Sequence, residues 1–134
     1  MVGSCQISIF EACWYLRGLE QFYMDLALDR DYCCALMDTV MRFPLVAAQQ
    51  YAALGADMVW FGDDISNQQG LSLSPAMWRD YLMPRYAELF AAPKEINPDI
   101  KVAWHSCGNC AAVLDDMIEI GRYRRASWKI GTNK

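Results

Sequence analysis

The apolar residues in the first half of the chain recur mostly at helical spacing. Residues 19–29 predict one helix, and its apolar positions are Leu19, Phe22, Tyr23 and Leu26. The next predicted helix is capped by Asp29 or Asp31, and its apolar face holds Leu36, Met37, Val40 and Met41. Pro44 should kink or divide this second helix, which is expected to end at Gly55.

Elsewhere, short apolar runs predict strands. Met58-Val59-Trp60-Phe61 has no polar position, which is typical of a strand buried on both faces in a parallel sheet. Residues 100–104 predict another strand. The alternation at Ile7 and Ile9 predicts a short strand within residues 1–10.

A helix is predicted after each of the strands at residues 58–61 and 100–104. Ser74-Pro75 is a typical helix start, with Ser74 as the N-cap, and Pro84 should bend that helix. Its apolar face holds Trp78, Leu82, Tyr86, Leu89 and Phe90. Residues 111–120 predict a last helix, and the side chains expected to face inward are Val113, Leu114, Met117 and Ile118. This alternation predicts an α/β fold with a parallel sheet, and no GxGxxG or Walker A pattern supports a phosphate-binding version of it.

Composition and charge exclude several classes of protein. Hydrophobic residues make up 54% and charged residues 21% of the 134 positions, which is typical of a folded domain and not of a disordered chain. The net charge of -4 argues against a nucleic-acid partner. No uncharged apolar run reaches the roughly 18 residues of a membrane span, and Glu11 and Arg17 interrupt any signal peptide. We therefore expect a cytoplasmic protein with no membrane partner.

The charge balance changes near the end of the chain. Residues 1–121 hold all sixteen acidic residues and seven of the twelve basic ones, whereas residues 122–134 hold only basic charges. The hydrophobic pattern stops at the same place. We interpret residues 1–121 as the folded domain and residues 122–134 as a solvated basic tail or as unrelated sequence.

Six cysteines are present, but without a signal peptide they are not expected to form a disulfide framework. Cys13, Cys33 and Cys34 lie among apolar residues, which is typical of buried, inert thiols. Cys107 and Cys110 lie in a different setting, after a predicted strand.

Polar residues follow both long apolar strands. Asp63 and Asp64 come directly after the first strand, and His105 and Cys107 directly after the second. The carboxyl ends of parallel strands meet at one edge of a sheet, so the two groups should lie about 5–10 Å apart if the strands are neighbours. The acidic pair is either solvated or faces this edge, where a carboxylate can ligate a metal, accept a proton or hold a substrate amine or hydroxyl.

His105 and Cys107 have a spacing that suits metal ligands. Residues two apart on an extended segment point to the same side, and imidazole nitrogen and thiolate sulfur both bind zinc. Cys110, Asp63 or Asp64 are candidates for further ligands. Two alternatives stay open: a hydrogen-bonded histidine beside an inert thiol, or a Cys107/Cys110 redox pair in which the following helix lowers the pKa of Cys107.

Several segments resemble the uroporphyrinogen decarboxylase superfamily over residues 7–121. The most specific ones are, in order, Gly62-Asp63-Asp64, Leu73-Ser74-Pro75-Ala76-Met77-Trp78 and His105-Ser106-Cys107-Gly108. Others are Phe10-Glu11-Ala12, Leu16-Arg17-Gly18-Leu19-Glu20, Met24-Asp25-Leu26 and Tyr51-Ala52-Ala53-Leu54-Gly55-Ala56-Asp57. The resemblance implies a (β/α)8 TIM barrel, which needs about 250 residues. Residues 1–121 would then be a partial barrel of about three βα units, an interior fragment.

The two branches of this superfamily imply different chemistry. The decarboxylases act on a tetrapyrrole without metal or cofactor, through an aspartate and an arginine in an N-terminal region not found in this sequence. The cobalamin-dependent branch, such as methylcobamide:coenzyme M methyltransferases, binds zinc through a His-x-Cys motif and a distant downstream cysteine. His105 and Cys107 match the first two of these ligands, and Cys110 does not match the third by position.

The resemblance therefore favours a fragment of an enzyme that transfers a methyl group from a methylated corrinoid to a thiol. The expected partner is a small-molecule substrate or a corrinoid protein. Zn²⁺ is the implied metal, and Asp63 or Asp64 would complete its ligand shell or position the acceptor. The alternatives are a uroporphyrinogen decarboxylase-like lyase of porphyrin biosynthesis, a CxxC redox or metal-binding module, and an inactive truncated product. Open barrel edges predict that the isolated chain oligomerises, aggregates or is only marginally folded.

Overall fold

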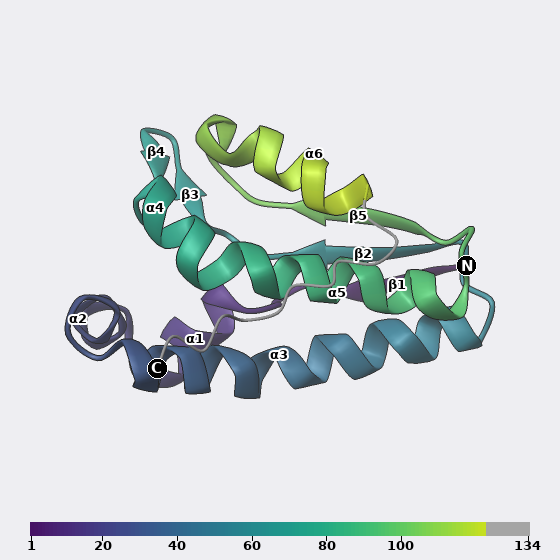
Figure 1. Ribbon diagram of the computed structural model, residues 1–134, viewed down its shortest axis with the longest axis horizontal. Helices are drawn as coiled ribbons and strands as arrows, with labels where there is room; N and C mark the ends of the chain where they lie inside the picture. The colour runs from purple at the N-terminus through teal and green to yellow at the C-terminus, as the bar shows by residue number, and fades with distance from the viewer. Residues whose placement is uncertain (123–134) are drawn as a thin grey trace, which may run out of the picture.

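Three parallel strands form the centre of the computed structural model, which describes residues 1–122 (Figure 1). They are β1 (Val2–Cys5), β2 (Met58–Gly62) and β5 (Lys101–His105), in the order β1-β2-β5. The apolar run that predicts a parallel strand is thus the central strand of the sheet. Each strand is followed by helices, so the described chain holds three βα units, as expected for a partial barrel.

The helices occupy both long connections and the end of the described chain. Between β1 and β2 lie α1 (Phe10–Arg17), α2 (Leu19–Leu28) and α3 (Arg30–Ala53). Between β2 and β5 lie a small hairpin of β3 (Ser66–Asn67) and β4 (Gly70–Leu71), then α4 (Pro75–Met77), the π-helical turn η1 (Trp78–Leu82) and α5 (Met83–Ile96). A 3-10 turn, η2 (Ala111–Val113), leads into α6 (Leu114–Arg122) after β5.

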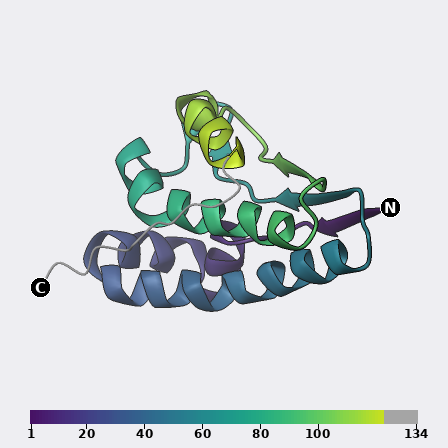
Figure 2. The ribbon, with the colours of Figure 1, turned by 45° about the vertical axis from the view of Figure 1, so that its right-hand side comes forward.

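One face of the sheet packs against helices, and Figure 2 shows α3 and α5 together on that side. Val59 and Phe61 of β2 are fully buried there, and the Phe61 ring lies 5.8 Å from that of Phe90 on α5. Met58 and Trp60 alternate onto the other face, which in a closed barrel is the interior, and both are only half-buried. Burial of this strand on both faces is therefore not found within residues 1–122.

Helix α3 follows its predicted course, with one difference. The Asp29 carboxylate caps it by accepting a hydrogen bond from the backbone N–H of Tyr32 at 3.1 Å. Pro44 lies inside the helix and does not divide it, because one missing hydrogen bond is offset by packing of the buried proline and its neighbours. The helix ends in a Schellman motif at Gly55, whose φ of 78° is readily adopted by glycine.

The helical segment after Ser74 also starts as predicted and then changes its winding. Ser74 Oγ accepts a hydrogen bond from the backbone N–H of Met77 at 3.1 Å. The bend expected at Pro84 takes the form of the π-helical turn just before it. Proline has no N–H and its ring crowds the carbonyl four residues earlier, here that of Asp80, and a wider turn relieves both problems.

The ends of the described chain differ in part from their predicted structure. A strand forms within residues 1–10 as predicted, but at Val2–Cys5 and not at Ile7 and Ile9. Ile9 is instead buried beside the start of α1, a helix that the apolar pattern does not predict. Leu114 and Ile118 do not face inward, since they are 52% and 44% exposed. The buried side of this last helical segment is formed by Val113, Met117 and Ile120.

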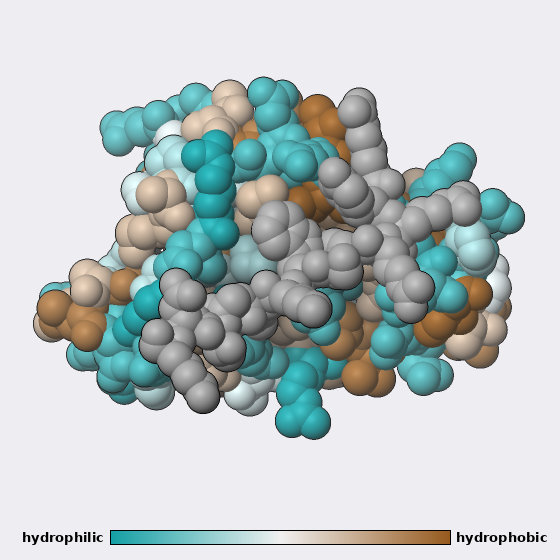
Figure 3. Space-filling view, viewed as in Figure 1, coloured by the Kyte–Doolittle hydropathy of each residue, from teal (hydrophilic) through white to brown (hydrophobic). Residues whose placement is uncertain are grey.

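The surface in Figure 3 is largely hydrophilic, and apolar side chains show at several separate places, one of which is the end where α2 lies. The exposed apolar residues of α2 are Leu19, Met24 and Leu28. Within the described residues, no helix has the length and apolar character that a bilayer crossing requires. All of the predicted basic tail beyond Arg122 lies outside the described residues.

Candidate metal centre

The two predicted polar groups lie side by side, because β2 and β5 are neighbours. Gly62 pairs with His105 in the parallel register, and the backbone N–H of Asp63 donates to the His105 carbonyl at 3.0 Å. The prediction that both strand ends meet at one edge is confirmed. The site is therefore built from two consecutive βα units.

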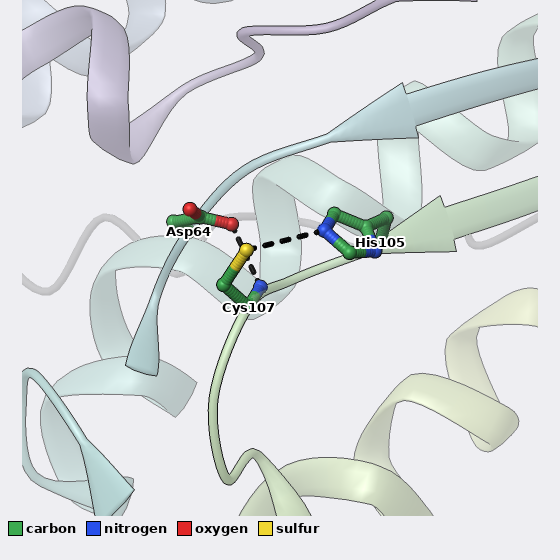
Figure 4. Close-up of side chains that lie close together, drawn as sticks. All are labelled: Asp64, His105 and Cys107. Carbon is green, nitrogen blue, oxygen red and sulfur yellow. Dashed lines mark hydrogen bonds between the residues drawn. The ribbon is translucent and has the colours of Figure 1, made fainter. Parts of the chain in front are cut away.

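Three of the predicted residues bring potential ligand atoms together, as Figure 4 shows. One ligand atom each from Asp64, His105 and Cys107 lies within 4.8 Å of the others. Cys107 Sγ is 3.4 Å from His105 Nε2, and the backbone N–H of Cys107 donates to Asp64 Oδ1 at 2.7 Å. His105 and Cys107 are exposed and Asp64 is half-buried, so an ion can reach the cluster from solvent.

The Asp64 carboxylate also acts on the Cys107 thiol electrostatically. It hydrogen-bonds the protonated thiol and repels a thiolate, which raises the pKa of Cys107 above its ordinary value. The redox interpretation expects the opposite direction, a pKa lowered by the following helix. The raised pKa is the opposite of that expectation, because the nearest charge is the negative Asp64 carboxylate.

A clamp from the β3–β4 hairpin holds the loop that carries Cys107. Ser66 Oγ donates to the Cys107 carbonyl at 2.6 Å, and the backbone N–H of Asn109 donates to the Asn67 carbonyl at 2.7 Å. Gly108 has a φ of 84°, and a Cβ added there would lie 2.5 Å from that same Asn67 oxygen. The glycine is thus required by conformation and by space. Glycine directly after Cys107 is the only sequence signal of this close approach.

Asp63 lies at the same sheet edge but faces a different partner. It is fully buried, and its carboxylate accepts backbone hydrogen bonds from Ile9, Phe10 and Glu11 at 2.7–2.8 Å. It also accepts a hydrogen bond from the hydroxyl of Tyr86 on α5. Burial raises the pKa of Asp63, and these four hydrogen bonds oppose the rise. Asp63 therefore caps α1 and lies outside the cluster of Asp64, His105 and Cys107, so its predicted catalytic role stays a prediction.

Glu11 is a contributor that the sequence pattern does not single out. Its Oε2 accepts a hydrogen bond from the backbone N–H of Asp64 at 3.0 Å, which holds the backbone of this candidate ligand in place. Burial raises the pKa of Glu11, and the charges of Asp63 and Asp64 add to that rise. An acidic residue in the first turn of a helix is the available signal, but α1 itself is not predicted.

Cys110, the remaining predicted residue, is not part of the cluster. It is half-buried and precedes η2, where its carbonyl accepts a hydrogen bond from the backbone N–H of Val113 at 3.1 Å. Its role as a ligand or redox partner stays a prediction. Among the described residues, Asp64, His105 and Cys107 are the group with metal-ligand proximity.

Consecutive βα units with a polar cluster at the carboxyl ends of their strands define part of a (β/α)8 barrel. A family model described as uroporphyrinogen decarboxylase (URO-D) matches residues 2–127. The chain therefore belongs to the URO-D family.

A solved structure, a methyltransferase from Methanosarcina mazei, has a similar fold with a TM-score of 0.74 and 22% sequence identity. The match covers 90% of this chain and 33% of that chain, so the present sequence spans about a third of that protein's length. At this identity the likeness shows the fold. A comparison with curated protein sequences found no significant match.

Proposed function

We propose that this chain carries the zinc-binding part of an enzyme that transfers a methyl group from a methylated corrinoid to a thiol. The observation that carries the proposal is the convergence of Asp64, His105 and Cys107 at the carboxyl edge of the sheet. Membership in the URO-D family and the methyltransferase fold of the similar structure support it.

The donor set fits zinc by type, and its histidine–cysteine pair also fits by spacing. Zinc binds histidine nitrogen, cysteine sulfur and carboxylate oxygen at about 2.0–2.3 Å, and tetrahedral ligand atoms are then about 3.3–3.8 Å apart. The 3.4 Å between Cys107 Sγ and His105 Nε2 already has this value. Three protein ligands and one open position are typical of catalytic zinc, and the open position would take the acceptor thiol or the distant cysteine that the resemblance implies.

Bound zinc would supply Lewis acidity, which keeps a coordinated thiol in its thiolate form at neutral pH. The proposed reaction joins the acceptor sulfur to the methyl carbon and breaks the carbon–cobalt bond of the corrinoid substrate. The electron pair of that bond stays on cobalt, and the thiol proton goes to solvent. Within the chain, Asp64, His105 and Cys107 would bind the ion. Asp64 also accepts the backbone N–H of Cys107, and Glu11 accepts the backbone N–H of Asp64.

Metal titration of the full 134-residue chain tests this proposal. Co²⁺ serves as the spectroscopic probe for zinc, and the variants are His105→Ala, Cys107→Ala and, as a matched thiol control, Cys110→Ala. Loss of a ligand should weaken affinity by more than the roughly 10–100-fold that loss of a ligand's supporting partner costs. We expect this at His105 and Cys107 and little change at Cys110.

Three outcomes would contradict the proposal in whole or in part. If the unmodified chain binds neither Zn²⁺ nor Co²⁺, the metal-free decarboxylase-like alternative takes its place. If Cys110→Ala abolishes binding, Cys110 belongs to the ligand set and the assignment by resemblance is wrong in that detail. A readily reversible Cys107–Cys110 disulfide, combined with no effect of His105→Ala, would favour the redox module.

A further inference from the structure

The imidazole of His105 is stacked on the indole of Trp60. The ring centroids are 5.7 Å apart and the planes are inclined by 24°. Trp60 pairs with Ala103 in the parallel register, and residue alternation places Trp60 and His105 on the same face of the sheet as diagonal neighbours. The stack therefore joins a residue of β2 to a candidate metal ligand of β5.

Gly62 provides the space in which this stack forms. Gly62 is the residue directly opposite His105, and a Cβ added to it would lie 3.0 Å from Cη2 and 3.2 Å from Cζ3 of Trp60. The indole thus lies across the bare backbone of Gly62 to reach the imidazole. A side chain at this position would push the two rings apart.

The imidazole has little else to hold it in place. Within the described residues it contacts the Cys107 thiol through Nε2, and neither ring nitrogen hydrogen-bonds to a carboxylate or a carbonyl oxygen. Metal-binding histidines are usually oriented by such a bond from the second nitrogen. The side chain of His105 is also exposed, so packing around it does not fix its rotamer.

We propose that Trp60 is a positioning residue that holds the His105 imidazole with Nε2 directed at the metal site. This inference rests on the proposed function, because metal binding is what the orientation would serve. The stack restricts rotation of the imidazole about its Cβ–Cγ bond, which lowers the entropy lost when Nε2 binds an ion. Trp60 acts through His105 and does not itself bind the metal.

The stack can be tested without metal, because His105 is the only histidine of the chain. Its imidazole gives a single Cε1–Hε1 NMR signal, and the ring current of Trp60 should shift that proton upfield from the value of free histidine. In Trp60→Leu the signal should return towards the free value, whereas Trp60→Phe keeps a ring and part of the shift. An unshifted signal in the unmodified chain would overturn the inference.

The metal arm measures Co²⁺ affinity and the absorption spectrum of the Co²⁺ site. Trp60→Leu should weaken affinity on the order of tenfold, as loss of a ligand-orienting partner does, and Trp60→Phe should recover most of that loss. Trp14→Leu is the matched control, since it removes a half-buried indole from a different ring pair, that with Tyr15 at 4.0 Å. Circular dichroism of each variant reports whether the fold is retained, and Trp60→Phe carries the test if Trp60→Leu does not fold.

The outcomes separate this inference from the proposed function. If His105→Ala abolishes Co²⁺ binding while Trp60→Leu and Trp60→Phe bind like the unmodified chain, the positioning role is wrong and the proposed metal site stands. If His105→Ala binds Co²⁺ unchanged, the proposed metal site is wrong and the orientation of His105 serves no metal there. Graded loss from Trp60→Phe to Trp60→Leu, with Trp14→Leu unchanged, supports both.

Discussion

Replacing Asp63 by alanine should detach the N-terminus of α1 from the sheet. The Asp63 carboxylate is fully buried and receives three backbone N–H groups of α1 and the Tyr86 hydroxyl. Loss of a helix cap costs about 1–2 kcal/mol, and a buried hydroxyl left without its partner costs about 1–3 kcal/mol. We therefore expect Asp63→Ala to destabilise α1 by about 2–5 kcal/mol.

Amide hydrogen exchange of the full chain measures this effect locally. The protection of residues 9–17 should fall by a factor of about 30 to 3,000, since each 1.4 kcal/mol corresponds to about tenfold. Asp63→Asn keeps one side-chain oxygen that can accept from some of these donors, but its NH₂ group faces the remaining donors and cannot accept from them. We therefore expect a loss of about 1–2 kcal/mol in the stability of α1. Asp99→Ala, at an exposed acidic position, should change stability by less than about 0.5 kcal/mol.

Unchanged protection of α1 in Asp63→Ala would refute the reasoning, because it would mean that apolar packing alone holds this helix. Tyr86→Phe separates the two kinds of contact. It removes the hydroxyl donor and leaves the three backbone bonds, so it should lower the protection of α1 less than Asp63→Ala does.

Three further predictions concern other parts of the molecule. Arg17 and Gln21 donate hydrogen bonds to the Asp25 carboxylate and lower its pKa below the ordinary value of 3.8. The stability that these bonds contribute is therefore present above pH 3.8 and is lost as the pH falls through the lowered pKa. In acid unfolding, Asp25→Asn should lack this pH-dependent loss of stability. Gly108→Ala should strain the loop by about 1–3 kcal/mol and weaken Co²⁺ binding in the titration described above. Gly121→Ala, at a helical position with open space around it, should change neither the stability nor the Co²⁺ affinity. The isolated chain should associate through its open sheet edges, and sedimentation that shows a cooperatively melting monomer would contradict this.

The central strand and the shared edge of the two polar groups could be predicted from the sequence because both follow from local pattern, whereas their adjacency also needs β2 and β5 to be neighbours. A continuous apolar run such as residues 58–61 has one usual place, the middle of a parallel sheet, and residues that follow parallel strands meet at one edge. The structure adds the strand register, in which Gly62 lies opposite His105.

Helix α1 and the different roles of Asp63 and Asp64 could not be predicted, because both depend on contacts between distant residues. The cap of α1 comes from Asp63, more than fifty positions later in the chain, and no local window contains it. The same contact gives Asp63 a buried partner, whereas its neighbour Asp64 lies beside Cys107. Two adjacent aspartates look equivalent in the sequence, and only the packing of α1 separates them.

The hydrogen bonds from backbone N–H groups that join the two loops of the candidate site affect which amino-acid substitutions the loops can accept. The N–H groups of Asp63, Ile65, Cys107 and Asn109 each bridge from one loop to the other. Every amino acid except proline supplies such a donor. Codons for residues 63, 65, 107 and 109 can therefore change without removing these donors, provided that none becomes proline. A proline at 63, 65 or 109 would remove one of these links between the two strand ends even if the side chains of Asp64, His105 and Cys107 were all kept.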